Sequence, residues 1–311
     1  MFVQFGPQHP GSHGLIKFTL ELSGETIQNS ILYIGLLHRG TEKLMETRPL
    51  YMGTPYMDRL DYVSTLTSEH AHVLGIEGLS SLQGVSPNFL KIRTVFDEIT
   101  RIKNHLMHVS ILTFDTGNFF IFFFFLEWRE HLMGFYEAVS GARLHAALYR
   151  PFESRFNYFN SFLIENINFY LNYFLFFFKN FFQPLLFFKI LKLRFVGVGI
   201  ISKTWARNAS ISGVIARSTG LRYDVRVPYQ TSYGYYRFLG FKTYVGSQGD
   251  LYDRMILMIA EIVESTIIIT QVLFKSFILS YDGGSSSKEL GSNLSPATEY
   301  VVNTKKKKQC V

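Results

Sequence analysis

Two histidines stand four residues apart in a turn-rich stretch near the start of the chain. The stretch FGPQHPGSHG, residues 5–14, holds His9 and His13 among two prolines and three glycines. That spacing can hold a metal ion on one face of a helix, but the prolines and glycines favour a loop. A simple turn, whose imidazoles bond only to nearby backbone, is the alternative interpretation of the same residues.

The other histidine pairs are weaker candidates for a shared metal or ligand site. His70 and His72 are two apart on a predicted helix, so they point to different faces and cannot share a ligand. His105 and His108 can share a face, but they stand beside a lysine, and we interpret them as a polar helix flank. The sequence has no HExxH motif, and its single cysteine allows no disulfide, zinc finger or cysteine-ligated cluster within the chain.

The elements that must position these residues are read from hydrophobic periodicity. Alternation around an SGE turn in LIKFTLELSGETIQNSILYIGLL predicts an N-terminal β-hairpin. Helices are predicted over residues 59–75, along KIRTVFDEITRIKNHLMHVSIL, over 126–147 and over 251–277, because apolar residues recur there at helical spacing. The Gly-, Ser- and Tyr-rich residues 197–249 predict loops and short strands.

These elements predict an α+β, mainly α fold. Residues 1–58 form the N-terminal β element with the histidine loop, and residues 59–280 form a helical body that includes the loop and short-strand region 197–250. Residues 281–311 are rich in Gly, Ser, Lys and Asn, so they are expected to be a disordered tail. At 311 residues the chain is long enough to bury a full core.

Composition narrows the function classes. The net charge is +7, but Lys305–Lys308 supply four of those charges, and the remaining +3 argues against nucleic-acid binding. The 31 phenylalanines fit a T-rich, organelle-type coding sequence. The apolar run Thr116–Leu126 is shorter than the roughly 20 residues that span a bilayer, so we expect no transmembrane helix, and we expect no signal or transit peptide.

Eight sequence blocks, in a fixed order, carry a family resemblance. They are FGPQHPGSHG, IGLLHRGTEKLMETR, MDRLDYVS, EITRIKNHLM, GFYEAVSGARLHAALYRP, GVGIIS, SGVIARSTGLRYDVR and VGSQGDLYDRM. Together they closely resemble the quinone-site subunit of respiratory complex I, the 49-kDa type, over about residues 5–275.

The resemblance implies a fold akin to the large subunit of nickel–iron hydrogenases. Where those hydrogenases carry a cysteine pair for nickel, this chain has LLHRGTEK at residues 36–43, without cysteine. The resemblance therefore implies no metal site in this chain. It also implies that the space instead accepts a quinone head group, next to a [4Fe-4S] cluster held by a smaller partner subunit.

By the same resemblance, His13 and Tyr62 donate hydrogen bonds to the quinone, and Asp115 is the carboxylate that keeps His13 charged. Reduction to the quinol takes two electrons and two protons. Histidine changes charge near neutral pH, whereas tyrosine supplies a neutral O–H. The alternatives remain open: Tyr62 as a buried helix aromatic on the face of Leu66 and Val73, and Asp115 as a turn residue at a helix C-terminus.

Arg39 and His145 match family residues close to the partner's iron–sulfur cluster, where positive charge raises the cluster's potential without ligating iron. The alternatives are an arginine exposed or paired with Glu42, and a histidine satisfied by its helix neighbours. His9 is expected only to support the loop around His13.

The resemblance implies a core subunit of NADH:quinone oxidoreductase that reduces ubiquinone, coupled to proton translocation, and that is inactive alone. The expected partners are the small iron–sulfur subunit and the membrane subunit where quinone enters. The expected location is the matrix side of the mitochondrial inner membrane, or the cytoplasmic face of a bacterial plasma membrane. An assembly or structural homologue that has lost quinone chemistry is the alternative.

Two stretches depart from the family pattern. The Phe-rich residues 155–195 replace an acidic linker, and they suggest either a partner-facing surface or coding bias. After Phe277 the chain does not follow the family's C-terminal segment, so we expect a changed reading frame or an unedited transcript there.

Overall fold

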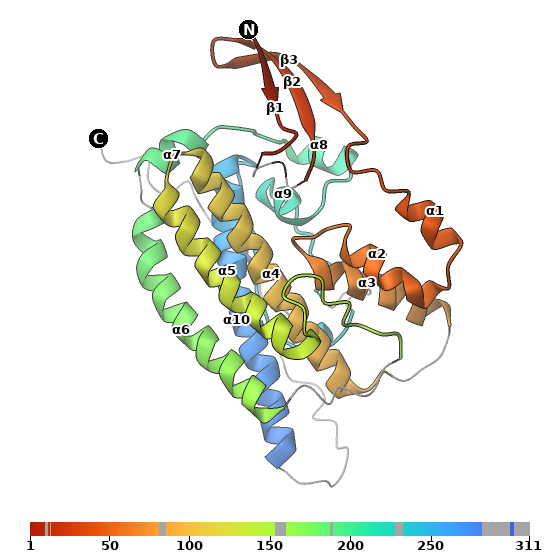
Figure 1. Cartoon of the computed structure of the whole chain (residues 1–311). Coiled ribbons are helices and arrows are strands. Elements are labelled where there is room, and N and C mark those ends of the chain that lie inside the picture. The colour runs from red at the N-terminus through yellow and green to blue at the C-terminus, as the bar shows by residue number, and fades with distance from the viewer. Residues whose placement is uncertain are drawn as a thin grey trace.

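Four long helices make the body of the computed structural model, and they run up and down alternately in chain order (Figure 1). They are α4 (Pro87–Asp115), α5 (Phe119–Ser140), α6 (Ser161–Leu186) and α10 (Leu251–Tyr281). The structure describes residues 1–9, 12, 14–80, 85–152, 160–186, 189–227, 233–281 and 299–301. The predicted α+β, mainly α class is confirmed.

A three-stranded antiparallel sheet projects from one end of this bundle (Figure 1). Its strands β1 (Phe2–Phe5), β2 (Lys17–Ser23) and β3 (Thr26–Tyr33) pair in the order β1-β2-β3. The β2–β3 hairpin is the predicted one, and it turns through Gly24, whose φ of +63° suits glycine. The sequence did not reveal β1, which pairs with β2.

In chain order, shorter helices follow the sheet and precede the long helices of the bundle. They are α1 (Thr41–Glu46), the 3₁₀ turn η2 (Leu50–Gly53), α2 (Thr54–Asp58) and α3 (Thr65–Leu79). The helix predicted to begin at Arg59 therefore begins only at Thr65. The Asp61 carboxylate accepts the backbone N–H groups of Val63 and Ser64, at 3.1 and 3.3 Å, and this local bonding competes with the helix.

Helix α4 contributes a fully buried apolar stripe to the hydrophobic core. Ser86 caps its first turn by accepting the N–H of Phe89 at 3.3 Å. The predicted apolar stripe is confirmed, since all five of its members are at most 1% exposed: Val95, Ile99, Ile102, Leu106 and Val109. They pack in one core with α5 and α10.

Helix α5 is shifted from its prediction at both ends. The Asn118 side chain caps it by accepting the N–H of Ile121 at 3.2 Å, so the helix starts at Phe119 and not at residue 126. Gly141, with φ of +76°, ends it before residue 147. Residues 141–150 are consequently a loop, and His145 lies on that loop.

The Phe-rich stretch forms α6 and α7 (Lys189–Phe195). One face of α6 is buried at helical spacing, through Leu163, Ile167, Leu171, Phe174 and Phe178. The opposite face leaves phenylalanines exposed, among them Phe162, Phe169 and Phe176.

Residues 197–250 contain more helix than predicted. They form α8 (Lys203–Asn208), α9 (Gly213–Ser218), the 3₁₀ turn η3 (Tyr236–Phe238) and one strand, β4 (Thr243–Val245). Strand β4 pairs in parallel with β5 (Glu299–Val301). Apart from Tyr281 and β5, the tail predicted to be disordered lies outside the described residues.

One described segment, Leu251–Phe274 in α10, is long and apolar enough by length and composition to cross a membrane. The prediction of no transmembrane helix, which rested on residues 116–126, overlooked it. Since 67% of this window is buried inside the protein, against α4, α6 and α9, its burial is that of a core helix.

Buried charges tie α4 to α9 and α10. Arg226 Nη1 lies 3.2 Å from Glu98 Oε1, and Arg217 Nη2 lies 2.6 Å from Glu261 Oε1. His105 Nε2 also reaches Glu261, at 3.0 Å, so the prediction of a polar helix flank for His105 is wrong. Burial alone raises the pKa of Glu98, but the charges of Arg226 and Arg101 outweigh it and lower that pKa.

Replacing one member of this network tests how much the network contributes to the stability of the fold. We expect Glu98→Gln to lower the free energy of unfolding by about 3–5 kcal/mol, because Arg226 loses a buried counter-charge. Glu46→Gln, which breaks the exposed pair with Lys43, is the control and should change stability by less than about 1 kcal/mol. Urea unfolding followed by circular dichroism measures both, and equal effects would contradict the expectation.

Candidate functional site

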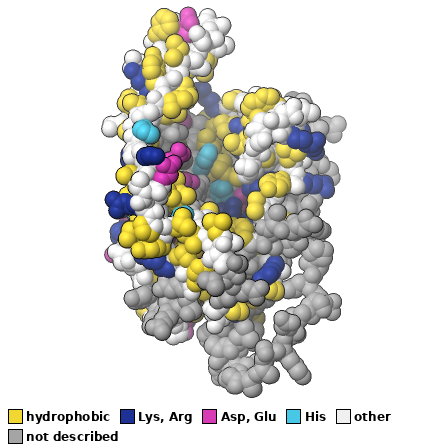
Figure 2. Space-filling model, turned by 90° about the vertical axis from the view of Figure 1, so that its right-hand side faces the viewer, with side chains coloured by type: hydrophobic (Ala, Val, Ile, Leu, Met, Phe, Trp, Pro, Cys, Tyr) yellow, Lys and Arg dark blue, Asp and Glu magenta, His cyan; other side chains and the backbone are white. Residues whose placement is uncertain are grey.

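A cavity of about 520 Å³ lies where the strands of the sheet meet the helical body. Its lining residues follow β1, precede β2 and follow β3, and they face the α2–α3 turn and α4. They are Pro7, Gln8, His9, Gly14, Leu15, Leu37, Tyr62, Val63 and Met107. Most are apolar, with a few polar groups among them, which is typical of a site for a small organic ligand. Figure 2 shows this side of the molecule hollowed below the projecting sheet, with histidine and acidic side chains in the hollow.

Tyr62 is the hydroxyl donor of this cavity. It stands in the turn between α2 and α3 and is 37% exposed, so the alternative of a buried helix aromatic is wrong. Burial, and then the charge of Asp61, raise the pKa of Tyr62. The phenol therefore stays protonated at neutral pH and can donate a hydrogen bond.

The backbone at Gly14 approaches this tyrosine closely. A methyl group there would lie 3.7 Å from the Tyr62 hydroxyl oxygen and 3.1 Å from Leu37 Cδ1. The φ of Gly14 is +143°, in a region that side chains rarely adopt. Glycine at this position keeps the cavity open beside Tyr62.

His13 lies outside the described residues, and the loop on both sides of it is described. The Ser12 hydroxyl lies 2.7 Å from the His9 carbonyl oxygen and 2.6 Å from that of Gly14, bridging the loop. The His9 ring packs on Phe5 with centroids 4.1 Å apart, and it lines the cavity. His9 thus lines the cavity itself, whereas only a supporting role in the loop was predicted for it.

Asp115 is the last residue of α4, and its side chain is exposed. It does not line the cavity, and its position matches the alternative of a residue at a helix C-terminus. Its predicted pairing with His13 stays a prediction, because His13 is not described.

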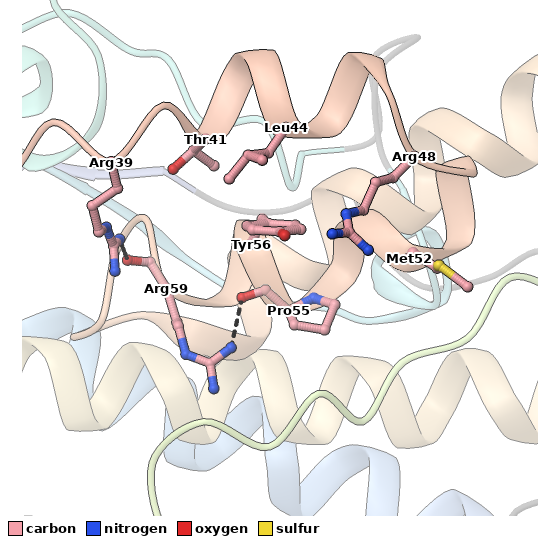
Figure 3. A pocket seen from close by; sticks show the side chains of 8 residues that line it. All are labelled: Arg39, Thr41, Leu44, Arg48, Met52, Pro55, Tyr56 and Arg59. Atoms are coloured by element: carbon pink, nitrogen blue, oxygen red, sulfur yellow. Dashed lines mark hydrogen bonds between the residues drawn. The ribbon is translucent and has the colours of Figure 1, made fainter.

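Arg39 belongs to a basic pocket of about 420 Å³ beside α1 and α2 (Figure 3). Its Nη2 donates to the carbonyl of Arg59 at 3.0 Å, and Arg59 Nη1 donates to the carbonyl of Pro55 at 3.2 Å. Arg48 also lines the pocket. Three guanidinium groups around one opening favour an anionic or electron-rich partner.

His145 is held by a residue distant in sequence. Its Nδ1 lies 2.9 Å from Asp58 Oδ2, and its side chain is 29% exposed while Asp58 is buried. The alternative of a histidine satisfied by helix neighbours is therefore wrong. Asp58 and Arg59 are consecutive, so the end of α2 contacts both His145 and Arg39, and Tyr62 follows three residues later.

Sequence reasoning missed several functional candidates. Asp58 stands in the block MDRLDYVS, and Glu69 stands in α3, but neither was given a role. Both are buried, and their sequence neighbours give no clear signal of that burial. His70, excluded only as a joint ligand, bonds Asp97 through Nδ1 at 2.5 Å.

The described residues contain no group of three or more His, Cys, Asp or Glu side chains placed to hold a metal ion. What they offer is a donor-lined apolar cavity beside a basic pocket, on a mainly helical scaffold.

Comparisons with known proteins place this scaffold in a family. Residues 115–288 match the family model described as "Respiratory-chain NADH dehydrogenase, 49 Kd subunit". The chain is 43% identical, over 273 residues, to the NADH-ubiquinone oxidoreductase 49 kDa subunit of Paramecium tetraurelia, covering 88% of this chain and 68% of that protein. It is 41% identical, over 294 residues, to a subunit of NADH-quinone oxidoreductase from Xanthomonas axonopodis pv. citri (strain 306), covering 86% and 67%.

The chain belongs to the 49 kDa subunit family of respiratory-chain NADH dehydrogenase, which confirms the predicted family. Proteins of this family are subunits of complex I, an oxidoreductase, so other subunits of that complex are the partners. That complex is membrane-associated.

Proposed function

We propose that this chain builds the site at which a NADH:quinone oxidoreductase complex reduces ubiquinone to quinol, coupled to proton translocation. The observation that carries the proposal is the cavity lined by Tyr62, Gly14 and His9. It lies one short turn away from Asp58 and Arg59, which hold His145 and Arg39.

The lining suits a quinone head group. Apolar side chains such as Leu15, Leu37 and Met107 can cover a planar ring, and the Tyr62 hydroxyl can donate to one of its carbonyl oxygens. That oxygen gains negative charge as electrons arrive, so a neutral donor whose pKa is raised stabilises the charge without losing its own proton early. We assign His13 as the second donor and Asp115 as its carboxylate, from the family pattern.

Electrons reach this cavity from a partner. Arg39 and His145 are assigned to the side that faces a [4Fe-4S] cluster held by the small iron–sulfur subunit, where their charge favours the reduced cluster. The second partner is the membrane subunit at which quinone enters. The site then lies on the matrix side of the mitochondrial inner membrane, or on the cytoplasmic face of the plasma membrane in a bacterium.

The three proposed quinone residues make a testable set. We expect His13→Ala and Asp115→Asn to lower quinone turnover to a similar extent, and their effects not to add, because both remove one charged donor. Tyr62→Phe deletes a single neutral hydrogen bond, so it should raise the barrier or weaken binding by about 1–3 kcal/mol, most visibly with short-tailed quinones.

The measurement is NADH:quinone turnover in membranes carrying each variant, with assembly checked on native gels. NADH:ferricyanide turnover is the control, because that electron path ends before the quinone. Intact quinone turnover in a fully assembled His13→Ala complex would reject the site and favour a structural homologue without quinone chemistry.

A second test uses two glycines with positive φ. Gly14→Ala should lower quinone turnover and raise the KM for short-tailed quinones, because the new methyl group would approach Leu37 and Tyr62. Gly24→Ala is the matched control, since its φ is +63° with no atom within 4 Å, and it lies in the hairpin turn. Both substitutions strain the backbone by about 1–3 kcal/mol, but only the first faces the cavity. Equal loss of turnover in both variants would contradict this assignment.

A further inference from the structure

Two carboxylates meet in the interior behind the cavity. Asp58 ends α2 and Glu69 lies in α3, and both are 0% exposed. Asp58 is close enough to Glu69 to raise the pKa of Glu69 both as a hydrogen-bonding neighbour and through its charge. Two carboxylates in contact, shielded from water, cannot both be ionised without a large electrostatic penalty.

Each carboxylate has one oxygen bonded and one oxygen open. Asp58 Oδ2 faces His145 Nδ1 at 2.9 Å, and Glu69 Oε2 accepts the backbone N–H groups of Leu148 and Tyr149 at 2.8 and 3.1 Å. The remaining oxygens, Asp58 Oδ1 and Glu69 Oε1, are buried and have no donor among the described residues. A proton placed between the two carboxyl groups satisfies both open oxygens.

We propose that Asp58 and Glu69 share one proton, forming a buried acid–carboxylate pair that positions the ring of His145. The proton resides mainly on Glu69, and Asp58 keeps the negative charge that faces His145. Asp58 thereby accepts the hydrogen bond of Nδ1–H and fixes the orientation of the His145 ring.

The location of the proton follows from the environment of each group. Burial, and then contact with Asp58, raise the pKa of Glu69 to about 8, against the lowering effect of the backbone N–H groups of Tyr149 and Leu148. Asp58 has the imidazole of His145 as an additional hydrogen-bonding partner, at 2.9 Å. The pair therefore holds one proton at neutral pH and releases it as the pH rises through about 8.

Other titratable groups surround the pair. They are Asp97 and Lys103 on α4, Arg129 and Tyr136 on α5, and His145 and Tyr149 on the loop after α5. The Nζ of Lys103 is buried without a hydrogen-bond partner among the described residues, and it lies over the Tyr136 ring at 3.5 Å from the centroid. Burial and the charge of Arg129 lower the pKa of Lys103 to about 7, and Asp58 opposes that shift. The tyrosines stay neutral, because burial raises the pKa of each.

Infrared difference spectroscopy of the assembled complex, between pH 6.5 and pH 9, tests the shared proton. We expect a protonated-carboxyl stretching band that is lost as the pH rises through about 8 and that is absent in Glu69→Gln. Glu77→Gln is the matched control: Glu77 is paired with Arg93 at 2.7 Å, its pKa is lowered, and the band should persist. An identical band in the wild type and in Glu69→Gln would overturn the proposal.

Asp58→Asn provides a second, independent variant. It removes the neighbouring charge that holds the proton on Glu69, so the band should titrate at a lower pH than in the wild type. An unchanged midpoint would show that the two carboxyl groups do not share a proton, even if Glu69→Gln failed to assemble.

The effect on the partner's cluster rests on the proposed function, whereas the shared proton does not. Redox titration of that cluster by electron paramagnetic resonance should give the same potential for wild type and Glu69→Gln at pH 6.5. At pH 9 the variant should have the higher potential, because the wild type then carries one more negative charge near His145. If the expected infrared band is found but the two potentials are equal at pH 9, the pair is upheld as a proton site. Its action on the cluster is then rejected, and the result counts against the placement of His145 near the cluster.

Discussion

The turn that Asp61 imposes between α2 and α3 is the constraint on which the site depends. By accepting the N–H groups of Val63 and Ser64, this carboxylate stops the chain from continuing as one helix across residues 59–64. In one continuous helix, residues 58, 59 and 62 would project at fixed helical angles. The turn instead lets Asp58 point to the interior, Arg59 to the basic pocket and Tyr62 to the cavity.

The turn is anchored from outside as well as from within. Asn104 of α4 donates to the Ser64 hydroxyl, and Arg39 donates to the Arg59 carbonyl at 3.0 Å. The Asp58–His145 contact adds the loop that follows α5. Three separate parts of the chain therefore contact residues 58–64, which lie outside regular helix except for Asp58.

Local periodicity explains which parts of this arrangement the sequence predicts. The stripe along α4 and the β2–β3 hairpin follow from repeating apolar positions and a turn signal, and both are found where expected. Tyr62, Arg39 and His145 were found only through the family pattern. Nothing in residues 140–150 shows that His145 meets Asp58, because that contact joins residues 87 positions apart.

Single residues that act on the local backbone explain the errors in the predicted helix boundaries. Asn118, Asp61 and Gly141 each move a helix boundary, and single polar or glycine residues weigh little in a hydrophobic pattern that averages over several turns. The buried charges were missed for a related reason. Glu98 and His105 lie on the buried side of α4, but a pattern of residue types does not reveal the arginine or carboxylate that compensates each of them.

Helix α4 connects these features because its faces meet different partners. Glu98 and His105, seven residues apart on one face, meet the charges of Arg226 and Glu261. Arg93 and Asp97, four apart on another face, meet Glu77 and His70 in α3.

A third face of α4 carries Lys103 and Met107, one turn or about 6 Å apart along the axis. Lys103 is electrostatically coupled to Asp58, and Met107 lines the cavity. The buried carboxyl pair and the cavity thus share a wall of the most deeply buried helix. Charges buried in that wall are poorly screened by solvent, so charge that arrives in the cavity changes the proton affinity of groups only one helical turn away. Under the proposed function, proton binding behind the cavity and electron arrival within it would be coupled through the electrostatics of this helix.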